Sequence, residues 1–573
     1  MNITKFRASL LSGALLAVMS SCVDLNYNEL TTNDEDWVYD SPIYGVEKLV
    51  NDIYAQLTNG FENNWNGALL ASATDEAAYA LINSGIHTFY NGGWSANNPI
   101  PDYWKNNYTA IHEANSFLEK LDKIDLSDYI YSVTEGTSYE ELRARFELFP
   151  YEIRALRAYY YFELVRTYGD VPLVLSTLTI NEANNVEPTP ADEIFSFIVS
   201  ECDAIAEYLP ISYREEMSQH LGRTSRPFVM ALKARALLYA ASPLFNATGD
   251  LDKWKLAAEA NKYVIDHAGE WGIKMGTYAA LWGNDSFTNS EMIFAIAKTA
   301  DNTFERQNYP VGIEGGSSGN CPTQSLVDQY EYQSGDNAGK TFGEVHGGQV
   351  NVTSEHPYDN LDPRFAMTVV KNGDFWPLNA NQQREIQCYN TGFNAAPKVN
   401  ATPTGYYLRK YVDGNSDLTP NVNSQFRHAW IVMRLSEFYL NYAECIYNIT
   451  GNADDQGEFG LSANEAINKV RGRSDVQMPP FAGNPADFIT RYERERLVEF
   501  AFEDHRFWDV RRWKKGSQYF GSVYAADIER QANGNIILTR KKLTRVWDEK
   551  YNLFPIPYSE RMKNPKLTQN PGW

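Results

Sequence analysis

The chain of 573 residues is too long for one small core and long enough for one large helical domain or two to three domains. Its 43% hydrophobic and 22% charged residues are typical of a folded protein and argue against disorder. The formal net charge of −22 argues against a nucleic-acid partner, because phosphate binding needs a positive surface. The five cysteines form neither a disulfide framework nor a zinc-binding pair, so we predict no metal and no cofactor.

The first 21 residues have the layout of a secretory signal. A positively charged start is followed by an apolar run over residues 10–19, which is too short to span a bilayer. Small residues directly before Cys22 resemble a bacterial lipobox, which implies cleavage before Cys22 and lipidation of this residue. Residues 22–40 are rich in Asn, Asp, Glu and Thr, and are interpreted as a lipidated flexible tether. Several acyl chains on Cys22 would give stable membrane anchoring.

After the tether, helical periodicity dominates the chain from about residue 41 to 268. Within this part the clearest helical hairpin begins at Thr224 and Ser225, a helix-capping pair, with Pro227 in the first turn and Pro243 after the end. Two helices with a short link make a tetratricopeptide-like unit, which cannot bury its own faces alone. Further helix pairs are therefore expected among helices over residues 41–59, 100–122, 140–168 and 190–209.

Residues 269–428 lack such periodicity, because Gly, Asn, Pro, Ser and Thr interrupt short apolar runs. Periodicity returns from about residue 429 to 513, so residues 429–573 are expected to hold C-terminal helices and a closing segment. We therefore predict an all-α dominated fold for residues 41–573: a tetratricopeptide-like superhelix of about four helix pairs, with an irregular section packed on it.

The helix expected over residues 431–446 carries a polar stripe at helical spacing. Its members are Arg434, Glu437, Asn441 and Glu444. Such a stripe could form an active site, but charges on one face of a scaffold helix more often form ion pairs between helices. Residues 491–496 alternate in charge sign and are interpreted in the same way.

Four segments resemble the SusD/RagB family of nutrient-uptake lipoproteins. They are RALRAYYYFELVRTYGDVP at 154–172; MRLSEFYLNYAE at 433–444 with AINKVRGR at 466–473; YERERLVEFAFEDHRFWDVRRW at 492–513; and LFPIP at 553–557 through to the final QNPGW. The third segment departs from the family pattern at one point. Asp504 and His505 follow Glu503, where the family usually has a Gly.

The resemblance implies four tetratricopeptide-like helix pairs and an irregular section on that scaffold. It also implies a partner, a SusC-like TonB-dependent transporter, on which the lipoprotein sits as a lid facing the exterior of the outer membrane. The expected function is glycan binding at the cell surface without catalysis.

The matching segments lie in the scaffold, so ligand contacts are expected on loops. A sugar site needs aromatic faces for stacking and polar groups for the hydroxyls. Aromatics make up 14% of the chain, including 37 Tyr and 13 Trp. The candidates are Phe89, Tyr90 and Trp94 in one loop, Phe304, Tyr309, Phe375, Trp376 and Tyr407 in the irregular section, and Asp75 and Arg384 as polar groups.

An enzyme is the main alternative, either a surface glycoside hydrolase or an esterase, because carboxylates are abundant. Residues 315–319 match the pattern GxSxG, but Pro322 does not suggest the helix that a nucleophile elbow requires. Residues 452–463 resemble a calcium loop, yet Ala463 replaces the bidentate Glu, which favours a linker. An adhesive surface protein, or a family member that carries peptides or glycoprotein glycans, is also consistent with the sequence.

Overall fold

A computed structural model of the protein is dominated by helices, with 43% of residues in helix and 11% in strand. The structure describes residues 38–39, 42–61, 65–98, 103–131, 138–213, 222–283, 286–376, 383–422 and 424–573. The predicted signal peptide, the predicted lipidation site Cys22 and nearly all of the predicted tether lie outside these ranges. Within the described ranges, no helix combines the length and apolar character that crossing a bilayer requires.

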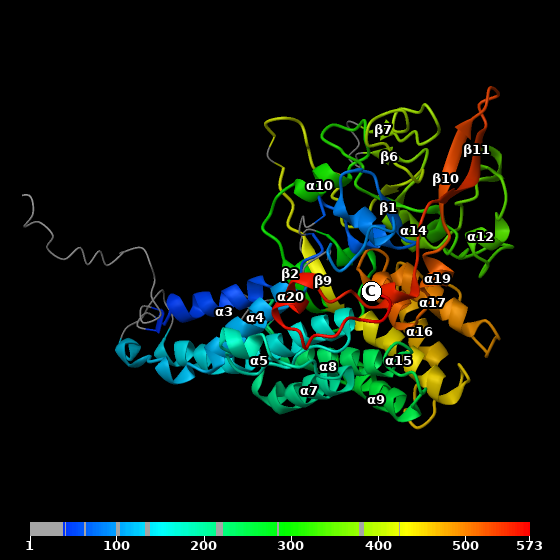
Figure 1. Ribbon diagram of the computed structural model, residues 1–573. Helices are drawn as coiled ribbons and strands as arrows, with labels where there is room; N and C mark the ends of the chain where they lie inside the picture. The colour runs from blue at the N-terminus through cyan, green and yellow to red at the C-terminus, as the bar shows by residue number, and fades with distance from the viewer. Residues whose placement is uncertain are drawn as a thin grey trace, which may run out of the picture.

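The helical scaffold forms the lower layer in Figure 1. Helices that are adjacent in the stack contact each other in the order α4, α5, α7, α8, α9, α15 and α16, and α3 packs on both α4 and α5. This confirms the predicted tetratricopeptide-like superhelix. The scaffold helices are α3 (Gly45–Ala55), α4 (Tyr103–Leu118), α5 (Tyr139–Tyr168), α7 (Ala191–Ile205), α8 (Arg226–Ala241), α9 (Leu251–His267), α15 (Leu435–Thr450), α16 (Ala463–Arg471), α17 (Phe488–Glu499) and α18 (His505–Arg512).

Local sequence signals set the ends of these helices. Ser138 and Glu141 form a reciprocal capping box at the start of α5, and Gly169 with φ of 74° ends it. Helix α8 starts after Ser225 and has Pro227 in its first turn, as predicted. The segment after α15 joins α15 directly to α16, as the linker interpretation expects.

Helix α15 begins four residues later than the sequence analysis expected. Ile431 lies in strand β9 (Ala429–Arg434), which pairs antiparallel with β2 (Met292–Ala297). Consecutive β-branched residues at positions 431 and 432 favour a strand, and every residue of β9 is buried. The expected helical start at Ile431 is therefore wrong, and Arg434 occupies the junction between strand and helix.

The upper layer consists of short strands, short helices and loops (Figure 1). Strand β1 (Ala77–Tyr79) pairs with β3 (Asn320–Pro322), β5 (Val369–Val370) with β8 (Tyr407–Leu408), and β6 (Phe375–Trp376) with β7 (Arg384–Glu385); β10 (Val523–Arg530), β11 (Ile536–Leu543) and β4 (Val350–Asn351) form a three-stranded sheet. The short helices of the chain are α6 (Ile180–Ala183), α10 (Thr303–Asn308), α11 (Gln324–Val327), α12 (Phe342–Val345), α13 (Val352–Glu355), α14 (Pro363–Thr368), α19 (Gly516–Tyr519) and α20 (Tyr558–Lys563).

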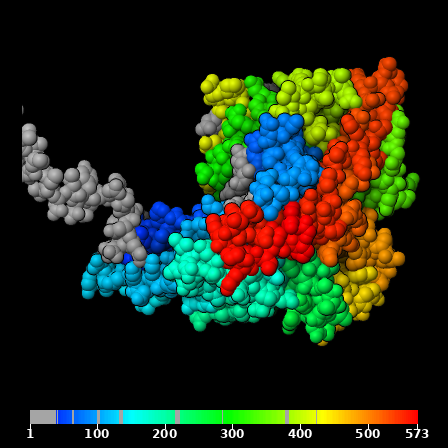
Figure 2. Space-filling model, viewed as in Figure 1, coloured from blue at the N-terminus to red at the C-terminus, as the bar shows by residue number. Residues whose placement is uncertain are grey.

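This loop layer is not confined to the irregular section predicted over residues 269–428. The β1–β3 pairing brings in residues around 77–79, and the β11–β4 pairing brings in the hairpin of β10 and β11. Figure 2 shows the early segment, in blue, lying in the upper layer beside the C-terminal segment, in red. The loop layer therefore draws on three separate parts of the chain.

A buried network of ion pairs joins the two layers. Glu499 of α17 accepts hydrogen bonds from Arg434 (2.7 Å), Arg473 (2.8 Å) and Arg364 (2.9 Å), and Arg364 belongs to α14 of the loop layer. Six carboxylates pair with six cations in this network: Glu291, Glu331, Asp362, Glu495, Glu499 and Glu503 with Arg364, Lys410, Arg434, Arg471, Arg473 and Arg494.

The polar stripe identified in the sequence has the structural role that was predicted. Arg434 contributes to the network, Glu437 pairs with Arg235 of α8, and Glu444 pairs with Arg512 of α18. Burial by itself would raise the pKa of Glu499, but the guanidinium groups of Arg473, Arg434 and Arg364 outweigh it and lower that pKa to about 2.

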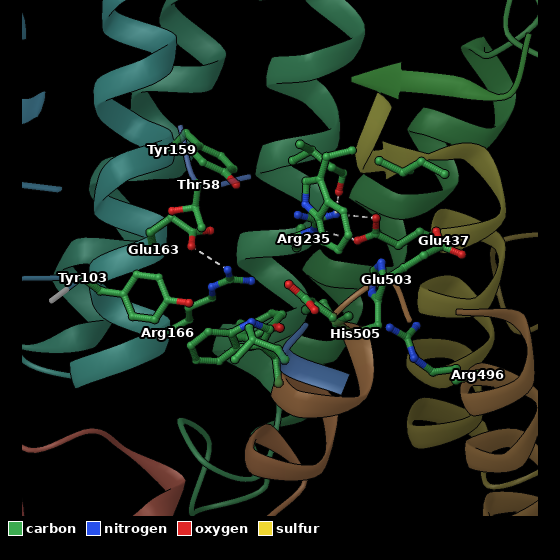
Figure 3. Close-up of a pocket in the computed structure, with 18 residues that line it drawn as sticks. Thr58, Tyr103, Tyr159, Glu163, Arg166, Arg235, Glu437, Arg496, Glu503 and His505 are labelled. Carbon is green, nitrogen blue, oxygen red and sulfur yellow. Dashed lines mark hydrogen bonds and ion pairs between the residues drawn. The ribbon is translucent and has the colours of Figure 1, made fainter. Parts of the chain in front are cut away.

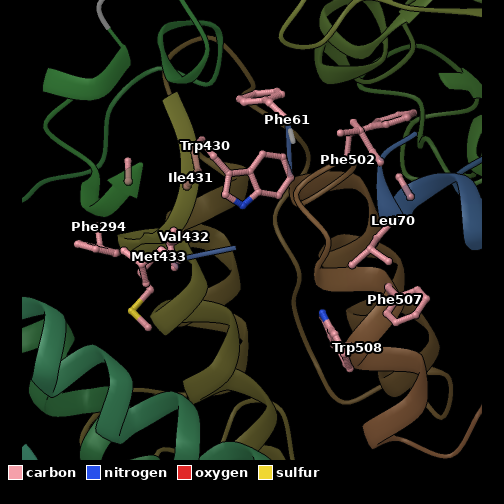
Figure 4. Packing of buried hydrophobic residues seen from close by; sticks show 14 of the residues in the cluster. Phe61, Leu70, Phe294, Trp430, Ile431, Val432, Met433, Phe502, Phe507 and Trp508 are labelled. Atoms are coloured by element: carbon pink, nitrogen blue, oxygen red, sulfur yellow. The ribbon is translucent and has the colours of Figure 1, made fainter. Parts of the chain in front are cut away.

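Aromatic and aliphatic side chains pack around these charges. Phe61 and Trp430 meet edge to face with ring centroids 5.2 Å apart, and both are buried. Figure 4 shows the residues of β9 and those near α18 lining the same interior, with Trp430, Phe502 and Trp508 among them. Such surroundings lower the local dielectric and strengthen the ion pairs, while they also make an unpaired charge costly.

We predict that Glu499→Gln strongly destabilises the protein. The substitution leaves three buried guanidinium groups without their shared carboxylate, and removing one partner of a buried pair costs about 3–5 kcal/mol. Urea unfolding followed by circular dichroism measures the loss. The matched control is Asp52→Asn, which breaks the exposed Lys48–Asp52 pair on α3 and should cost about 0.5 kcal/mol or less.

The same carboxylate gives a pH dependence with a defined sign. Because the folded pKa of Glu499 lies below its unfolded value, its contribution to stability is complete above the unfolded pKa of about 4.5 and is lost as the pH falls toward 2. Glu499→Gln should lack this part of the acid dependence. Equal stability losses in the Glu499 and Asp52 variants would contradict a central role for the network.

Candidate ligand-binding surface

The structure places Phe89 and Trp94 inside the protein. Each side chain is only 3% exposed, so the expectation that the loop over residues 89–94 presents Trp94 to a ligand is wrong. The C-terminal segment covers the indole: Phe554 and Trp573 lie with ring centroids 4.6 and 5.1 Å from it. Tyr90 is partly exposed, and the guanidinium of Arg545 lies 3.7 Å from the centre of its ring.

Asp75 is also unavailable to a ligand. Its two carboxylate oxygens accept hydrogen bonds from Arg506, at 2.9 and 2.7 Å, and the residue is 6% exposed. The expectation that Asp75 supplies a free polar group is therefore wrong, because a buried carboxylate must be paired. Phe304 is buried as well, in edge-to-face contact with Phe61.

Three further candidates form a floor beneath the surface of the loop layer. Tyr309, Trp376 and Tyr407 are all buried, so the expectation that they contact a ligand directly is not met. Tyr309 and Trp376 pack edge to face at 5.0 Å, and the Tyr407 hydroxyl donates to the carbonyl of Asn394. These residues support the chain segment above them.

That segment, residues 387–398, carries exposed aromatic rings. The side-chain oxygen of Gln387 accepts a hydrogen bond from the Tyr389 hydroxyl at 3.0 Å and another from the Phe393 backbone N–H at 3.3 Å. Phe393 is 43% exposed, and Tyr389 is partly exposed. Phe375, on strand β6 of the neighbouring hairpin, is 53% exposed. We call Phe375, Tyr389 and Phe393 the aromatic platform.

Polar side chains surround the platform. The exposed Glu385 of β7 lies opposite Phe375 in the β6–β7 pairing, and Arg384, one of the predicted site residues, is the exposed residue before it. The Lys398 ammonium lies 3.7 Å from the centre of the Phe393 ring. Asn390 donates from its side chain to Asp527 of β10 at 3.0 Å. Rings with nearby amide and cationic groups are the combination that carbohydrate binding requires.

Buried hydrogen bonds fix the platform to the loop layer. Asn394 is fully buried; its side chain accepts from the Gln387 N–H at 3.0 Å and donates to the Val311 carbonyl at 2.7 Å. The backbone N–H of Asn390 donates to the carbonyl of Ile528 in β10, at 2.7 Å. The platform is thus held from both sides and is organised before any ligand arrives.

The sequence contained a signal for this segment. Residues 389–394 read Tyr, Asn, Thr, Gly, Phe and Asn, which is the mixture of aromatic, amide and glycine residues that singled out residues 89–94. Composition did not distinguish the two loops, because the difference lies in what covers them.

Two pockets in the described parts of the chain are less suitable for a sugar. The first, between α5, α8, α15 and α18, has a volume of only about 50 Å³ (Figure 3). Two pairs of charged groups in its walls are already engaged with each other, Glu163 with Arg166 and Glu437 with Arg235. Ligand pockets usually have volumes of about 300–1,000 Å³, so this cavity fits a few water molecules at most.

The second pocket, of about 240 Å³, lies between α4, α20 and residues 172–186. Two of its three lining amides are already occupied: Asn115 donates to the Val174 carbonyl, and Asn564 donates to the Val186 carbonyl. Lys563 at its rim pairs with Glu560 at 2.8 Å. Its aromatic residues are buried, as Trp104 is, or half-buried, as Tyr108 is, so the aromatic platform with its exposed Phe375 and Phe393 rings is the better candidate surface.

We predict that Asn394→Ala loosens the platform while leaving the scaffold folded. The substitution removes the side-chain partner of the Gln387 N–H and of the Val311 carbonyl. Each unpaired buried group costs about 1–3 kcal/mol. Hydrogen exchange should accelerate in residues 387–398, and thermal unfolding should begin earlier. The control is Asn533→Ala, in the exposed turn between β10 and β11. Unchanged exchange in residues 387–398 would contradict the role assigned to Asn394.

Known proteins with the same organisation were found by comparison of sequence and structure. A SusD-like protein of Formosa agariphila is 22% identical over 98% of both chains. A SusD-like protein of Bacteroides fragilis superposes with a TM-score of 0.76 at 22% identity, covering 94% of this chain and 98% of its own. A SusD-like carbohydrate-binding protein of the same species gives a TM-score of 0.73 at 24% identity, covering 93% of this chain and all of its own.

Two family models match consecutive parts of the chain. Residues 26–238 match the model described as starch-binding associating with outer membrane. Residues 287–573, half of the chain, match the model of the SusD family. The resemblance noted in the four sequence segments is confirmed, and the protein belongs to the SusD family.

Proposed function

We propose that this protein binds glycans at the cell surface and passes them, chemically unchanged, to a SusC-like TonB-dependent transporter. The observation that carries the proposal is the aromatic platform, with rings exposed on a frame fixed by Gln387 and Asn394. Membership of the SusD family supports it, as does the similar fold of a carbohydrate-binding protein.

The platform explains how a neutral sugar could be held. Ring faces of Phe375, Tyr389 and Phe393 stack on the C–H faces of pyranose rings, and nearby amide and cationic groups bond the hydroxyls. An open surface of this kind gives modest affinity for one sugar unit. Tethering beside a transporter raises the effective concentration of the ligand, so modest affinity is sufficient for uptake.

Binding without catalysis is supported by the state of the carboxylates. Those of the buried network are paired with cations inside the protein, where no glycosidic bond can reach them. The segment 315–319, which matches GxSxG, leads into strand β3, whereas a nucleophile elbow leads into a helix. The alternative of a surface hydrolase or esterase therefore receives no support from these groups.

We predict that Phe393→Ala and Phe375→Ala each weaken glycan binding. Loss of one stacking partner costs about 0.5–1.5 kcal/mol, which corresponds to roughly two- to tenfold in affinity. A glycan array identifies a bound glycan, calorimetry with that glycan measures the loss, and reducing-end analysis checks that the glycan is not cut. The matched control is Tyr131→Ala, an aromatic residue that is 98% exposed beyond the C-terminal end of α4. Full affinity in both platform variants would discard the platform, and new reducing ends would favour an enzyme.

We also propose that lipid on Cys22 anchors the protein in the outer membrane. The described chain begins at the far end of the helical layer, near α3, while β6 and β7 lie on top of the loop layer (Figure 1). An anchor on that side leaves the platform accessible to a ligand. Cells grown with labelled palmitate should label the wild-type protein but not Cys22→Ala, and the variant should leave the membrane fraction. Equal labelling of both proteins would discard the anchor.

A further inference from the structure

Cationic side chains stand at both ends of a continuous row on the platform. At one end, the Arg530 guanidinium donates to the Tyr389 hydroxyl at 3.3 Å, and its carbon lies 5.6 Å from the centre of that ring. At the other end, the Lys398 ammonium lies over the Phe393 ring. Gln387 joins the two aromatic residues through one oxygen atom. The row of contacts therefore runs from Arg530 through Tyr389, Gln387 and Phe393 to Lys398.

These cations have no acidic partner among the described residues. No carboxylate of that part of the chain lies within 4.0 Å of the charged nitrogens of Lys398, Arg530 or Arg384. All three residues are exposed. The neighbouring acids include Asp527, which accepts from Asn390, and Glu385, which is exposed on β7. Although the chain has 73 acidic and only 51 basic residues, these three exposed cations keep their charges available to a ligand.

From this row we infer that the platform recognises anionic glycans, whose sugar rings carry carboxylate or sulfate groups. The inference rests on the proposed function and specifies its class of ligand. A pyranose ring that stacks on Tyr389 or Phe393 holds its substituents at the ring edge, where Arg530 and Lys398 stand. Uronates and sulfate esters share the same chemistry here, a negative group with several acceptor oxygens.

The contacts that these cations make without ligand are weak enough to be exchanged. An exposed ammonium over a ring gains only about 0.5–1 kcal/mol. A guanidinium that bonds one hydroxyl keeps several N–H groups for a bidentate contact with an anion. An ion pair with hydrogen bonds can therefore replace the present contact of Lys398 and add to that of Arg530.

The net charge of −22 does not prevent such binding. At physiological salt, charges farther away than the Debye length of about 8 Å are largely screened. The groups that touch the ligand therefore decide the contact energy, and at this row they are positive. The rest of the surface lowers the association rate of a polyanion more than it lowers the affinity.

The test uses the full-length protein, purified in detergent, on an array of neutral, uronate-containing and sulfated polysaccharides. The best-bound glycan is then titrated at low and high salt into the wild type, Lys398→Gln, Arg530→Gln and the control Lys255→Gln on α9, an exposed lysine of the scaffold. We expect an anionic glycan, weaker binding at high salt, and about fivefold weaker binding for each platform variant, the upper range of one exposed ion pair.

The possible results are distinguishable. Binding of uronate-containing or of sulfated glycans identifies the source of the negative charge. Binding of neutral glycans alone, with affinity reduced by Phe393→Ala, overturns the inference and leaves the proposed function intact. An anionic glycan whose affinity is the same in Lys398→Gln, Arg530→Gln and the wild type also overturns it. If no glycan binds, the proposed function itself fails.

Discussion

The shared carboxylate of Glu499, buried among three guanidinium groups, is the interaction on which the architecture depends. Charges that leave water lose several kcal/mol of hydration, and only complete pairing offsets that loss. Arg434 comes from the β9–α15 junction, Arg473 follows α16 and Arg364 comes from the loop layer. The carboxylate can therefore be satisfied only when helical scaffold and loop layer are docked together. The equal number of acids and cations in the network leaves the interior close to neutral.

Docking of the layers in turn determines what reaches the surface. Below the platform, Tyr309 and Trp376 pack on each other, and Tyr407 bonds to Asn394. Each of these contacts lies inside the loop layer, which has few regular strands of its own. A loop without a sheet or helix beneath it would lose conformational entropy when it orders around a ligand. Here the buried aromatic floor and the Asn394 hydrogen bonds have ordered it already, which reduces that cost.

Much of the scaffold could be predicted from the sequence. Helical periodicity and capping residues located α3, α4, α5, α7 and α8, because these signals are local. The structural role of Arg434 and Glu444 followed from their spacing, although their partners did not. The start of α15 was wrong because an apolar, β-branched run at positions 431 and 432 suits a strand as well as a helix. The strand forms because β2, which is far away in sequence, supplies the backbone hydrogen-bonding partner.

The candidate site was less predictable, for a physical reason. Trp94 is buried because Phe554 and Trp573, more than 450 residues later, pack on it, and no local pattern reveals such a cover. Of the residues named in advance, Phe375 belongs to the platform and Arg384 is exposed on the same hairpin, while Tyr309, Trp376 and Tyr407 are buried. The loop carrying Tyr389 and Phe393 has the same composition as the buried loop. Only tertiary packing separates an aromatic residue that supports a surface from one that forms it.

Asn394 shapes the loop from inside, whereas its neighbours Phe393 and Lys398 are exposed, and this separation has an evolutionary consequence. The ring of Phe393 and the ammonium of Lys398 reach outward, while the bonds that shape the loop run through Asn394, Gln387 and backbone groups. Outward-facing side chains can therefore be replaced with little effect on folding. The SusD-like proteins that share only about one identical residue in five with this chain keep the same fold.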